Sequence, residues 1–245
     1  MRLRVLGSSS DGNCYLLEGQ DETLILEAGV LAPEIKKALS WNLRRVSGCL
    51  VSHRHNDHAR SVKGLIDCGI KVYALDDVLE HKGVGESPFS NSIKPLDRFK
   101  VGGFKVMPFD VCHDVPCVGF VISHEEMGKL LFITDTMMTE YRFKGINHFM
   151  VEANYSDELL DDSISRGMVP ESMRERLHHS HMELGTTIGV LRANNLEETN
   201  SVILIHLSRN NSDNEAFKEA VESACGVPVM IAVPGMEKEL SKEVY

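Results

Sequence analysis

Three histidines and an aspartate lie within six residues, in the segment His53-Arg-His-Asn-Asp-His58. An apolar stretch at 48–52 comes just before and predicts a buried strand, and a helix is expected after it at 59–68. In a strand-exit loop, residues two apart can point to one side. His53 and His55 could then bind one metal ion, and Asp57 and His58 a second. Imidazole and carboxylate donors suit zinc, manganese or iron, and the residues do not choose among them.

Single polar residues further along the chain could complete such a site. His113 ends a strand-like stretch at 105–112, Asp135 follows an apolar stretch at 130–134, and His206 follows another at 202–205. Ligands in open α/β folds commonly lie where strands end. Each residue alone could equally be a capping aspartate or a satisfied core histidine, but the joint pattern favours a metal site.

The rest of the chain supplies the elements that must position these residues. Helices are expected at 33–39, 59–68, 156–177, 183–191 and 214–224. Further strands are expected at 2–6, 14–18, 23–27, 71–74, 104–109, 118–123, 129–134, 149–153, 201–206 and 227–233, and 83–99 is loop-rich. Strands in two sets, each followed by helices, predict a layered α/β fold. No composition break marks a linker, so residues 1–245 are expected to form one domain.

Composition limits the partners. The net charge is −10, with 36 acidic and 26 basic residues, so bulk charge does not predict a nucleic-acid ligand. It does not exclude one either, because bound metal ions add local positive charge. No apolar run is long enough to cross a bilayer, and no membrane partner is expected. The six cysteines form no CxxC pair, which favours reduced thiols and a cytoplasmic location.

The order HxHxDH, then single His, Asp and His residues, resembles the ligand order of the metallo-β-lactamase superfamily. The residues that carry the resemblance span most of the chain: His53, His55, Asp57, His58, His113, Asp135 and His206. The resemblance implies a four-layer αββα sandwich. It does not fix the reaction, because the superfamily includes lactamases, thioesterases, nucleases and phosphodiesterases.

Three further segments narrow the resemblance to the YycJ (WalJ) branch. They are Gly7-Ser-Ser-Ser-Asp-Gly-Asn-Cys14, Val151-Glu-Ala-Asn154 and His206-Leu-Ser-Arg-Asn-Asn211. That branch is viewed as DNA-processing, with exonuclease activity. This chain is a divergent member: it has Glu27-Ala-Gly29 where the branch has Asp, His179-Ser-His-Met-Glu183 where it has H-G-H-L-S, and Tyr155-Ser156 where it has His-Asp. The branch acid props the metal-binding loop, so the longer Glu27 alters that support.

The resemblance implies two divalent metal ions, zinc or manganese, with a bridging hydroxide that attacks phosphorus. Metal one would be held by His53, His55 and His113, metal two by Asp57, His58 and His206, and Asp135 would bridge them. The catalytic residues would be Asp57 and His181, the latter as the general acid in a polar loop at 178–181. Phosphate contacts would come from Arg174, Arg176 and Arg209.

The leading hypothesis is a phosphodiesterase acting on nucleic acid, as a DNA exonuclease. An alternative is the same chemistry on a small nucleotide such as a cyclic nucleotide, which the net charge of −10 favours. A third is a thioester or lactam hydrolase, and a fourth is a binding module without metals. The sequence leaves open which metal is bound and whether the substrate is DNA or RNA. It also leaves open whether cleavage is exo- or endonucleolytic, its polarity, and whether the protein forms a homodimer.

Overall fold

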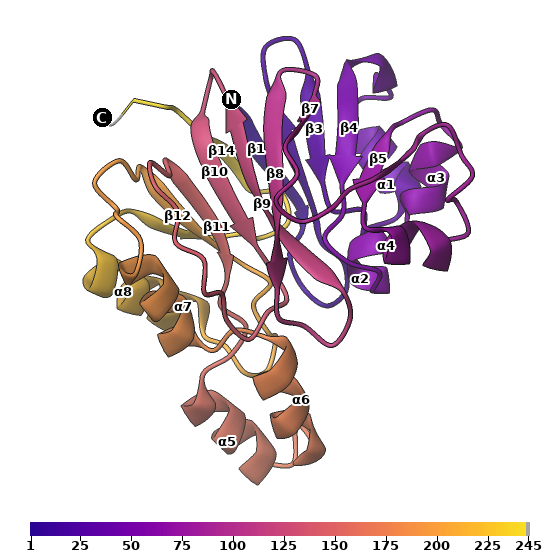
Figure 1. Ribbon diagram of the computed structural model, residues 1–245. Helices are drawn as coiled ribbons and strands as arrows, with labels where there is room; N and C mark the ends of the chain where they lie inside the picture. The colour runs from indigo at the N-terminus through magenta and orange to yellow at the C-terminus, as the bar shows by residue number, and fades with distance from the viewer. Residues whose placement is uncertain (244–245) are drawn as a thin grey trace.

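Two seven-stranded sheets pack face to face between layers of helices in the computed structural model, which describes residues 1–243 (Figure 1). Three groups of buried apolar side chains account for the layers. One fills the space between the sheets, including Phe104, Phe120 and Phe132. The second lies between the first sheet and its helices, and the third between the second sheet and its helices. The expected four-layer αββα sandwich is therefore confirmed.

The first sheet has the order β14-β1-β2-β3-β4-β5-β6. Its strands are β1 (Arg2–Gly7), β2 (Cys14–Glu18), β3 (Thr23–Leu26), β4 (Val46–Leu50), β5 (Val72–Ala74), β6 (Ser90–Ser92) and β14 (Glu237–Glu239). The helices of this half are α1 (Ala32–Ala38), α2 (Asn56–Ala59), α3 (Val62–Ile66) and α4 (Asp76–His81), with a 3₁₀ turn at Leu43–Arg45. Buried and partly exposed residues alternate along β1, as expected for a strand with one buried face.

The second sheet has the order β13-β12-β11-β10-β9-β8-β7. Its strands are β7 (Phe99–Val101), β8 (Phe104–Val111), β9 (Cys117–His124), β10 (Gly128–Ile133), β11 (His148–Glu152), β12 (Ser201–Ile205) and β13 (Val229–Ile231). The strands from β10 to β13 run parallel, and β11 and β12 are buried along their whole length. Such strands need cover on both faces, and α7 (Leu184–Arg192) and α8 (Asn214–Cys225) provide it outside.

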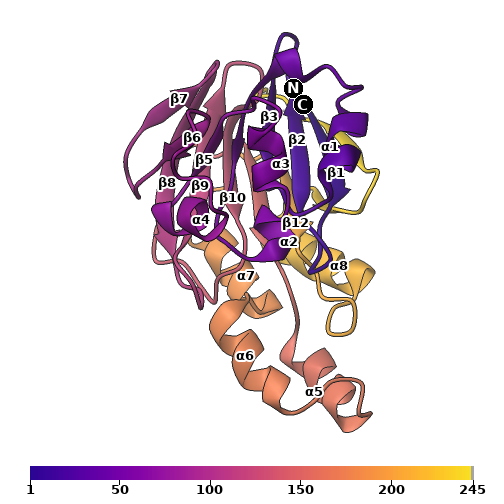
Figure 2. The ribbon, with the colours of Figure 1, turned by 90° about the vertical axis from the view of Figure 1, so that its right-hand side faces the viewer.

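Two helices project from the edge of the sandwich, α5 (Asp157–Ser165) and α6 (Ser172–Ser180) (Figures 1 and 2). One continuous helix was expected at 156–177, and that prediction was wrong. Gly167 has a left-handed φ of 69° and Pro170 follows, so the chain turns back between the helices. A small apolar group that includes Leu160 and Leu177 holds the pair together.

Other boundaries also differ from the sequence-based expectation. The helix expected at 59–68 is two short ones, α2 and α3, because Ser61 bonds back to Ala28 O through its N–H and to Val30 O through its hydroxyl. The short elements α4, β6, β7 and β14 and the 3₁₀ turn were not expected, and β6 lies within the stretch at 83–99 that was expected to be loop-rich. None of the helices among residues 1–243 is long and apolar enough to span a membrane.

Candidate metal centre

Three imidazoles meet where β4 and β8 end. His53 and His55 follow β4, with His55 at the start of α2, and His113 follows β8. His53 Nε2 lies 3.1 Å from His55 Nδ1, and His113 Nε2 lies 3.3 Å from the same atom. Nitrogens bound to one tetrahedral zinc ion are about 3.3 Å apart. Burial lowers the pKa of His53 and of His113, which favours the neutral rings that bind cations. The three therefore fit one ion.

A second donor group lies beside the first and comprises Asp57, His58, Asp135 and His206. His58 Nε2 is 3.0 Å from Asp135 Oδ2, and His206 Nε2 is 3.4 Å from Asp57 Oδ2. Burial raises the pKa of Asp135, but the neighbouring His206 and His58 rings outweigh it and hold that pKa well below its usual range. A buried group with two carboxylates and two imidazoles fits a second divalent ion.

The ring nitrogens that face away from these groups have partners of their own. His53 Nδ1 is 2.9 Å from Ser52 Oγ, and His113 Nδ1 donates to Ser180 O at 2.9 Å. His206 Nδ1 lies 2.9 Å from Glu152 Oε1. Such partners fix the ring orientation and leave the opposite nitrogen for a metal.

Glu27, which stands where the branch has Asp, lies buried beneath the second group. Its carboxylate accepts a hydrogen bond from Ser52 N at 3.2 Å, and it lies 3.5 Å from His58 Nδ1. That distance is within ion-pair range, and His58 Nδ1 has no hydrogen-bond partner among the described residues. Glu27 thus props the metal-binding loop despite its extra methylene group. Burial raises the pKa of Glu27.

Backbone strain is concentrated at the site. Glu27, Asp135 and His206 have φ values of 64°, 48° and 54°, in the left-handed region that non-glycine residues seldom adopt. Strain of this kind is tolerated where the surrounding structure holds it and is common at functional sites. Gly29 shows how tight the packing is, since a Cβ there would lie 1.6 Å from Asp57 O.

The turn at the start of the chain supports the ligand loops. Asn13 N donates to Asp57 O at 2.7 Å, and His206 N donates to Ser8 Oγ at 3.0 Å. Ser8 Oγ is in turn 2.8 Å from the buried Tyr15 hydroxyl. The segment that carries part of the family resemblance therefore positions ligands from both sheets.

Glu152, at the end of β11, was not singled out from the sequence. Its side chain is fully buried, and its Oε1 accepts a hydrogen bond from His181 Nδ1 at 2.7 Å besides facing His206. Its Oε2 accepts from the backbone N–H groups of Thr136 and Met182. Burial raises its pKa, but His181 outweighs this and the pKa is lowered. Its position at the end of an apolar strand, in the Val151–Asn154 segment, is the sequence feature that could have identified Glu152 as a site residue.

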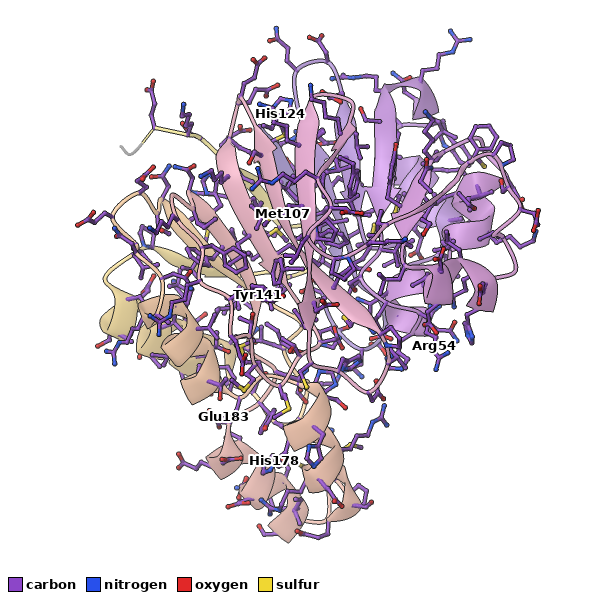
Figure 3. All side chains as sticks on the ribbon, in the orientation of Figure 1. Arg54, Met107, His124, Tyr141, His178 and Glu183 are labelled. Atoms are coloured by element: carbon purple, nitrogen blue, oxygen red, sulfur yellow. The ribbon has the colours of Figure 1, made fainter. Side chains whose placement is uncertain are left out.

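His181 lies at the end of α6 and lines a cavity of about 280 Å³ together with His55, Asp57, His113, Asp135 and His206. The loop expected at 178–181 was wrong, because His178 and His179 belong to the last turn of α6. His178 faces Asp157 of α5 at 3.0 Å instead of the cavity, and lies on the projecting pair in Figure 3.

The three predicted phosphate-binding arginines are placed differently. Arg176 lines the cavity. Arg174, on the same helix, is ion-paired with Asp161 and Glu171, and Arg209 is ion-paired with Asp11 at 2.6 Å. Arg174 and Arg209 are not among the described residues that line the cavity.

Asp135 belongs to the second donor group and also to a third donor group, which it forms with Glu152, His181 and His206. Its role as a bridge between two metal ions stays a prediction.

Comparison with known proteins shows the family to which the chain belongs. A model of the Beta-lactamase superfamily domain matches residues 28–207. Exodeoxyribonuclease YycJ of Bacillus anthracis is 29% identical over 238 residues, covering 90% of this chain and 88% of the relative. Exodeoxyribonuclease WalJ of Streptococcus pneumoniae is 25% identical over 225 residues, covering 86% and 83%. The metallo-β-lactamase fold protein YhfI of Bacillus subtilis superposes with a TM-score of 0.73 at 15% identity, covering 97% and 99%.

Proposed function

Since the chain belongs to the metallo-β-lactamase superfamily, in its YycJ/WalJ branch, we propose that it is a two-metal phosphodiesterase acting as an exonuclease on DNA. The observation that carries the proposal is the pair of adjoining donor groups at one cavity. Two relatives named as exodeoxyribonucleases, 29% and 25% identical, support the choice of DNA as substrate.

The donor sets assign the ligands in this proposal. His53, His55 and His113 hold one ion, and Asp57, His58 and His206 hold the other. Asp135 is shared, because a carboxylate has two oxygens to offer. When bound, divalent ions supply Lewis-acid activation of water and of the phosphate. Zinc and manganese both suit these donors.

His181 is the proposed proton donor to the leaving oxygen. Glu152 fixes the ring through Nδ1, which leaves Nε2 to carry the proton for the substrate. Asp135 Oδ1 lies 3.5 Å from the same Nδ1, so the ring is held against the second donor group. A positioned general acid typically contributes ~10²–10⁴-fold to the rate.

Arg176 is the proposed contact to the scissile phosphate or its neighbour, because it is the one predicted arginine that lines the cavity among the described residues. Its planar guanidinium can bind two phosphate oxygens at once. Arg174 and Arg209 would first have to leave their ion pairs with acidic side chains.

A second candidate is the same reaction on a small nucleotide. The cavity of about 280 Å³ is small, and Asp57, Asp114 and Asp135 contribute carboxylates to its lining. Together with the net charge of −10, this favours a ligand with few phosphates.

The test is product analysis with the metal-reconstituted full chain on duplex DNA, single-stranded DNA, RNA, a cyclic nucleotide, a thioester and nitrocefin. We expect metal-dependent release of mononucleotides from DNA ends, lost in Asp135→Ala. His179→Ala is the matched control, since this exposed histidine does not line the cavity in the described chain. Faster turnover of the cyclic nucleotide would favour the second candidate. Hydrolysis of the thioester or nitrocefin alone would refute both.

A further inference from the structure

The outer face of the second sheet over β7–β10 has no helix covering it among residues 1–243, whereas α7 and α8 cover the other end of the sheet (Figure 1). The segment 134–147 crosses this face instead. Its Tyr141 and Phe143 rings pack on Phe109 of β8, and Lys129 Nζ of β10 donates to Lys144 O at 3.1 Å.

A cavity of about 590 Å³ lies between this segment and the strands. Six cationic side chains line it, and we call them the basic groove: Arg98, Lys100, Lys105, Lys129, Arg142 and Lys144. No acidic residue within the described chain lines it, and none of the six has a carboxylate within 4.0 Å in residues 1–243. In a chain with a net charge of −10, this gathering of unpaired cations requires an explanation.

The strand register places three of the lysines in one row. Lys100 of β7 lies directly opposite Lys105 of β8, and both Lys105 and Lys129 lie opposite Ser123 of β9. Like charges opposite each other on neighbouring strands destabilise a sheet. Lys105 and Lys129 are two strands apart, or about 10 Å. A ligand with several negative charges would remove the repulsion.

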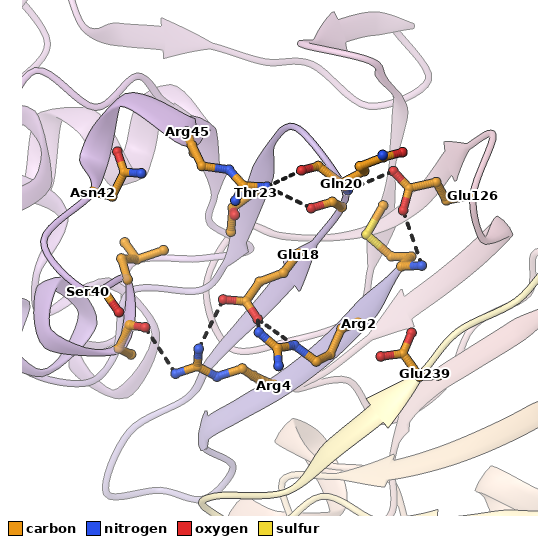
Figure 4. Close-up of a pocket in the computed structure, with 14 residues that line it drawn as sticks. Arg2, Arg4, Glu18, Gln20, Thr23, Ser40, Asn42, Arg45, Glu126 and Glu239 are labelled. Atoms are coloured by element: carbon orange, nitrogen blue, oxygen red, sulfur yellow. Dashed lines mark hydrogen bonds and ion pairs between the residues drawn. The ribbon is translucent and has the colours of Figure 1, made fainter.

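Two arginines in another surface cavity are placed differently. A polar cavity of about 460 Å³ near the N-terminus also contains arginines (Figure 4). There Arg2 and Arg4 both pair with Glu18, and Arg45 donates to backbone carbonyls. Glu18 therefore offsets the charge of Arg2 and Arg4, whereas no carboxylate among residues 1–243 forms an ion pair with the cations of the basic groove.

The basic groove and the metal centre lie on one strand. Asp135 comes six positions after Lys129 along β10 and its continuation, which is about 20 Å for extended chain. Tyr141 packs on Phe109, which lies between Lys105 and the end of β8 that leads to His113. Tyr141 is 37% exposed and lies below Met107 in Figure 3. Exposed aromatic rings can stack on bases. An adjoining cavity shares Lys105 and Lys129 with the basic groove. Glu22, Glu125, Glu198 and Lys242 also line it, so the excess of positive charge does not continue there.

We propose that the basic groove binds the sugar–phosphate backbone of a nucleic-acid strand whose end occupies the metal centre. The inference rests on the proposed function and adds a second contact region to it. At 3.4 Å of helix axis per phosphate in each strand of B-DNA, about 20 Å corresponds to roughly six phosphates, and to fewer in a more extended single strand. The basic groove should therefore affect only substrates longer than roughly six nucleotides.

The test compares Lys100→Ala/Lys105→Ala/Lys129→Ala with a matched triple variant, Lys37→Ala/Lys63→Ala/Lys71→Ala. The control removes the same charge from exposed lysines on the first half of the sandwich. Binding of a non-hydrolysable phosphorothioate single strand is measured against salt, and hydrolysis is measured on bis(p-nitrophenyl) phosphate and on oligonucleotides of increasing length.

We expect the groove variant to lose about two units of log–log salt slope, at ~0.7 per phosphate contact on single strands. Its kcat/KM should fall at least about tenfold on long strands, with dinucleotide and bis(p-nitrophenyl) phosphate turnover within twofold of wild type. An unchanged slope, or an equal loss in the control, would overturn the inference. The inference would also be overturned, without any variant, if the kcat/KM of the wild type did not rise with oligonucleotide length. Absence of all phosphodiester hydrolysis would refute the proposed function, while the binding result would still decide the basic groove.

Discussion

The buried Glu152 carboxylate accepts a hydrogen bond from His181 Nδ1 at 2.7 Å, and the same oxygen lies 2.9 Å from Nδ1 of the candidate ligand His206. One carboxylate thus couples the proposed proton donor to the second donor group. Because Glu152 also accepts from two backbone N–H groups, its own position is fixed.

Replacing Glu152 by Gln should lower both kcat and the affinity for the second metal. Loss of such a supporting group typically costs ~10–100-fold in activity or metal affinity. Metal titration and steady-state kinetics measure the two effects separately. A double-mutant cycle with His181→Ala should show that the two losses in kcat do not add. Fully additive losses would mean that Glu152 does not act through His181.

Replacing His181 by Ala should leave the metal content unchanged and slow turnover by ~10²–10⁴-fold. The loss should be smaller with a p-nitrophenol leaving group, because it scarcely needs a proton. Rates on substrates with good and poor leaving groups measure this, with His179→Ala as the control. Equal losses on both substrates would rule His181 out as the acid, and loss of metal would make its role structural.

Replacing Arg176 by Ala should raise KM for DNA by about 10–100-fold, because a hydrogen bond to a charged group contributes ~1.5–3 kcal/mol. Arg174→Ala removes the same side chain from the same helix, but one that is ion-paired with Asp161 and Glu171. We expect its effect on KM to be clearly smaller. An equal or larger effect of Arg174→Ala would reverse the assignment.

Acid should destabilise the fold through His148, which lies outside the site. This buried ring contacts Ser201 Oγ at 2.8 Å and donates to Ser241 O at 3.0 Å. Burial lowers its pKa to about 4. The unfolded chain therefore binds the proton first, and stability that is complete above about pH 6.5 is lost as the pH falls towards 4. The full loss is about 3 kcal/mol.

Denaturant unfolding of His148→Asn at pH 7 and pH 5 checks this. The variant should be less stable at pH 7 but lose less free energy of unfolding on acidification than wild type. His81→Asn, at an exposed position, is the control and should keep the wild-type dependence. The comparison cancels any acid-driven loss of metal, since all three proteins share the site. If His148→Asn lost as much free energy of unfolding between pH 7 and pH 5 as the wild type, His148 would not be the group responsible.

The convergence of the candidate ligands could be predicted from the sequence because most of them follow strongly apolar strands, whose ends meet at one edge of a sheet. His113 is the exception, since it follows β8, an antiparallel strand in which buried and exposed residues are mixed. Glu152 escaped notice because a single acid at the end of an apolar strand is also a common solvent-facing residue. The final turn of α6 was mistaken for a loop because its histidines and serine have no apolar period. The basic groove is invisible in the sequence, since its cations lie singly between residues 98 and 144 and only strand pairing brings them together.

The central claim is that two metal ions act together in phosphodiester hydrolysis at this site. It is tested most directly by titrating the metal-free chain with Zn²⁺ or Mn²⁺ while following mononucleotide release from DNA, with bound metal determined by elemental analysis. We expect the rate to reach its maximum at two ions per chain. Saturation at one ion, or no hydrolysis at any ratio, would contradict it.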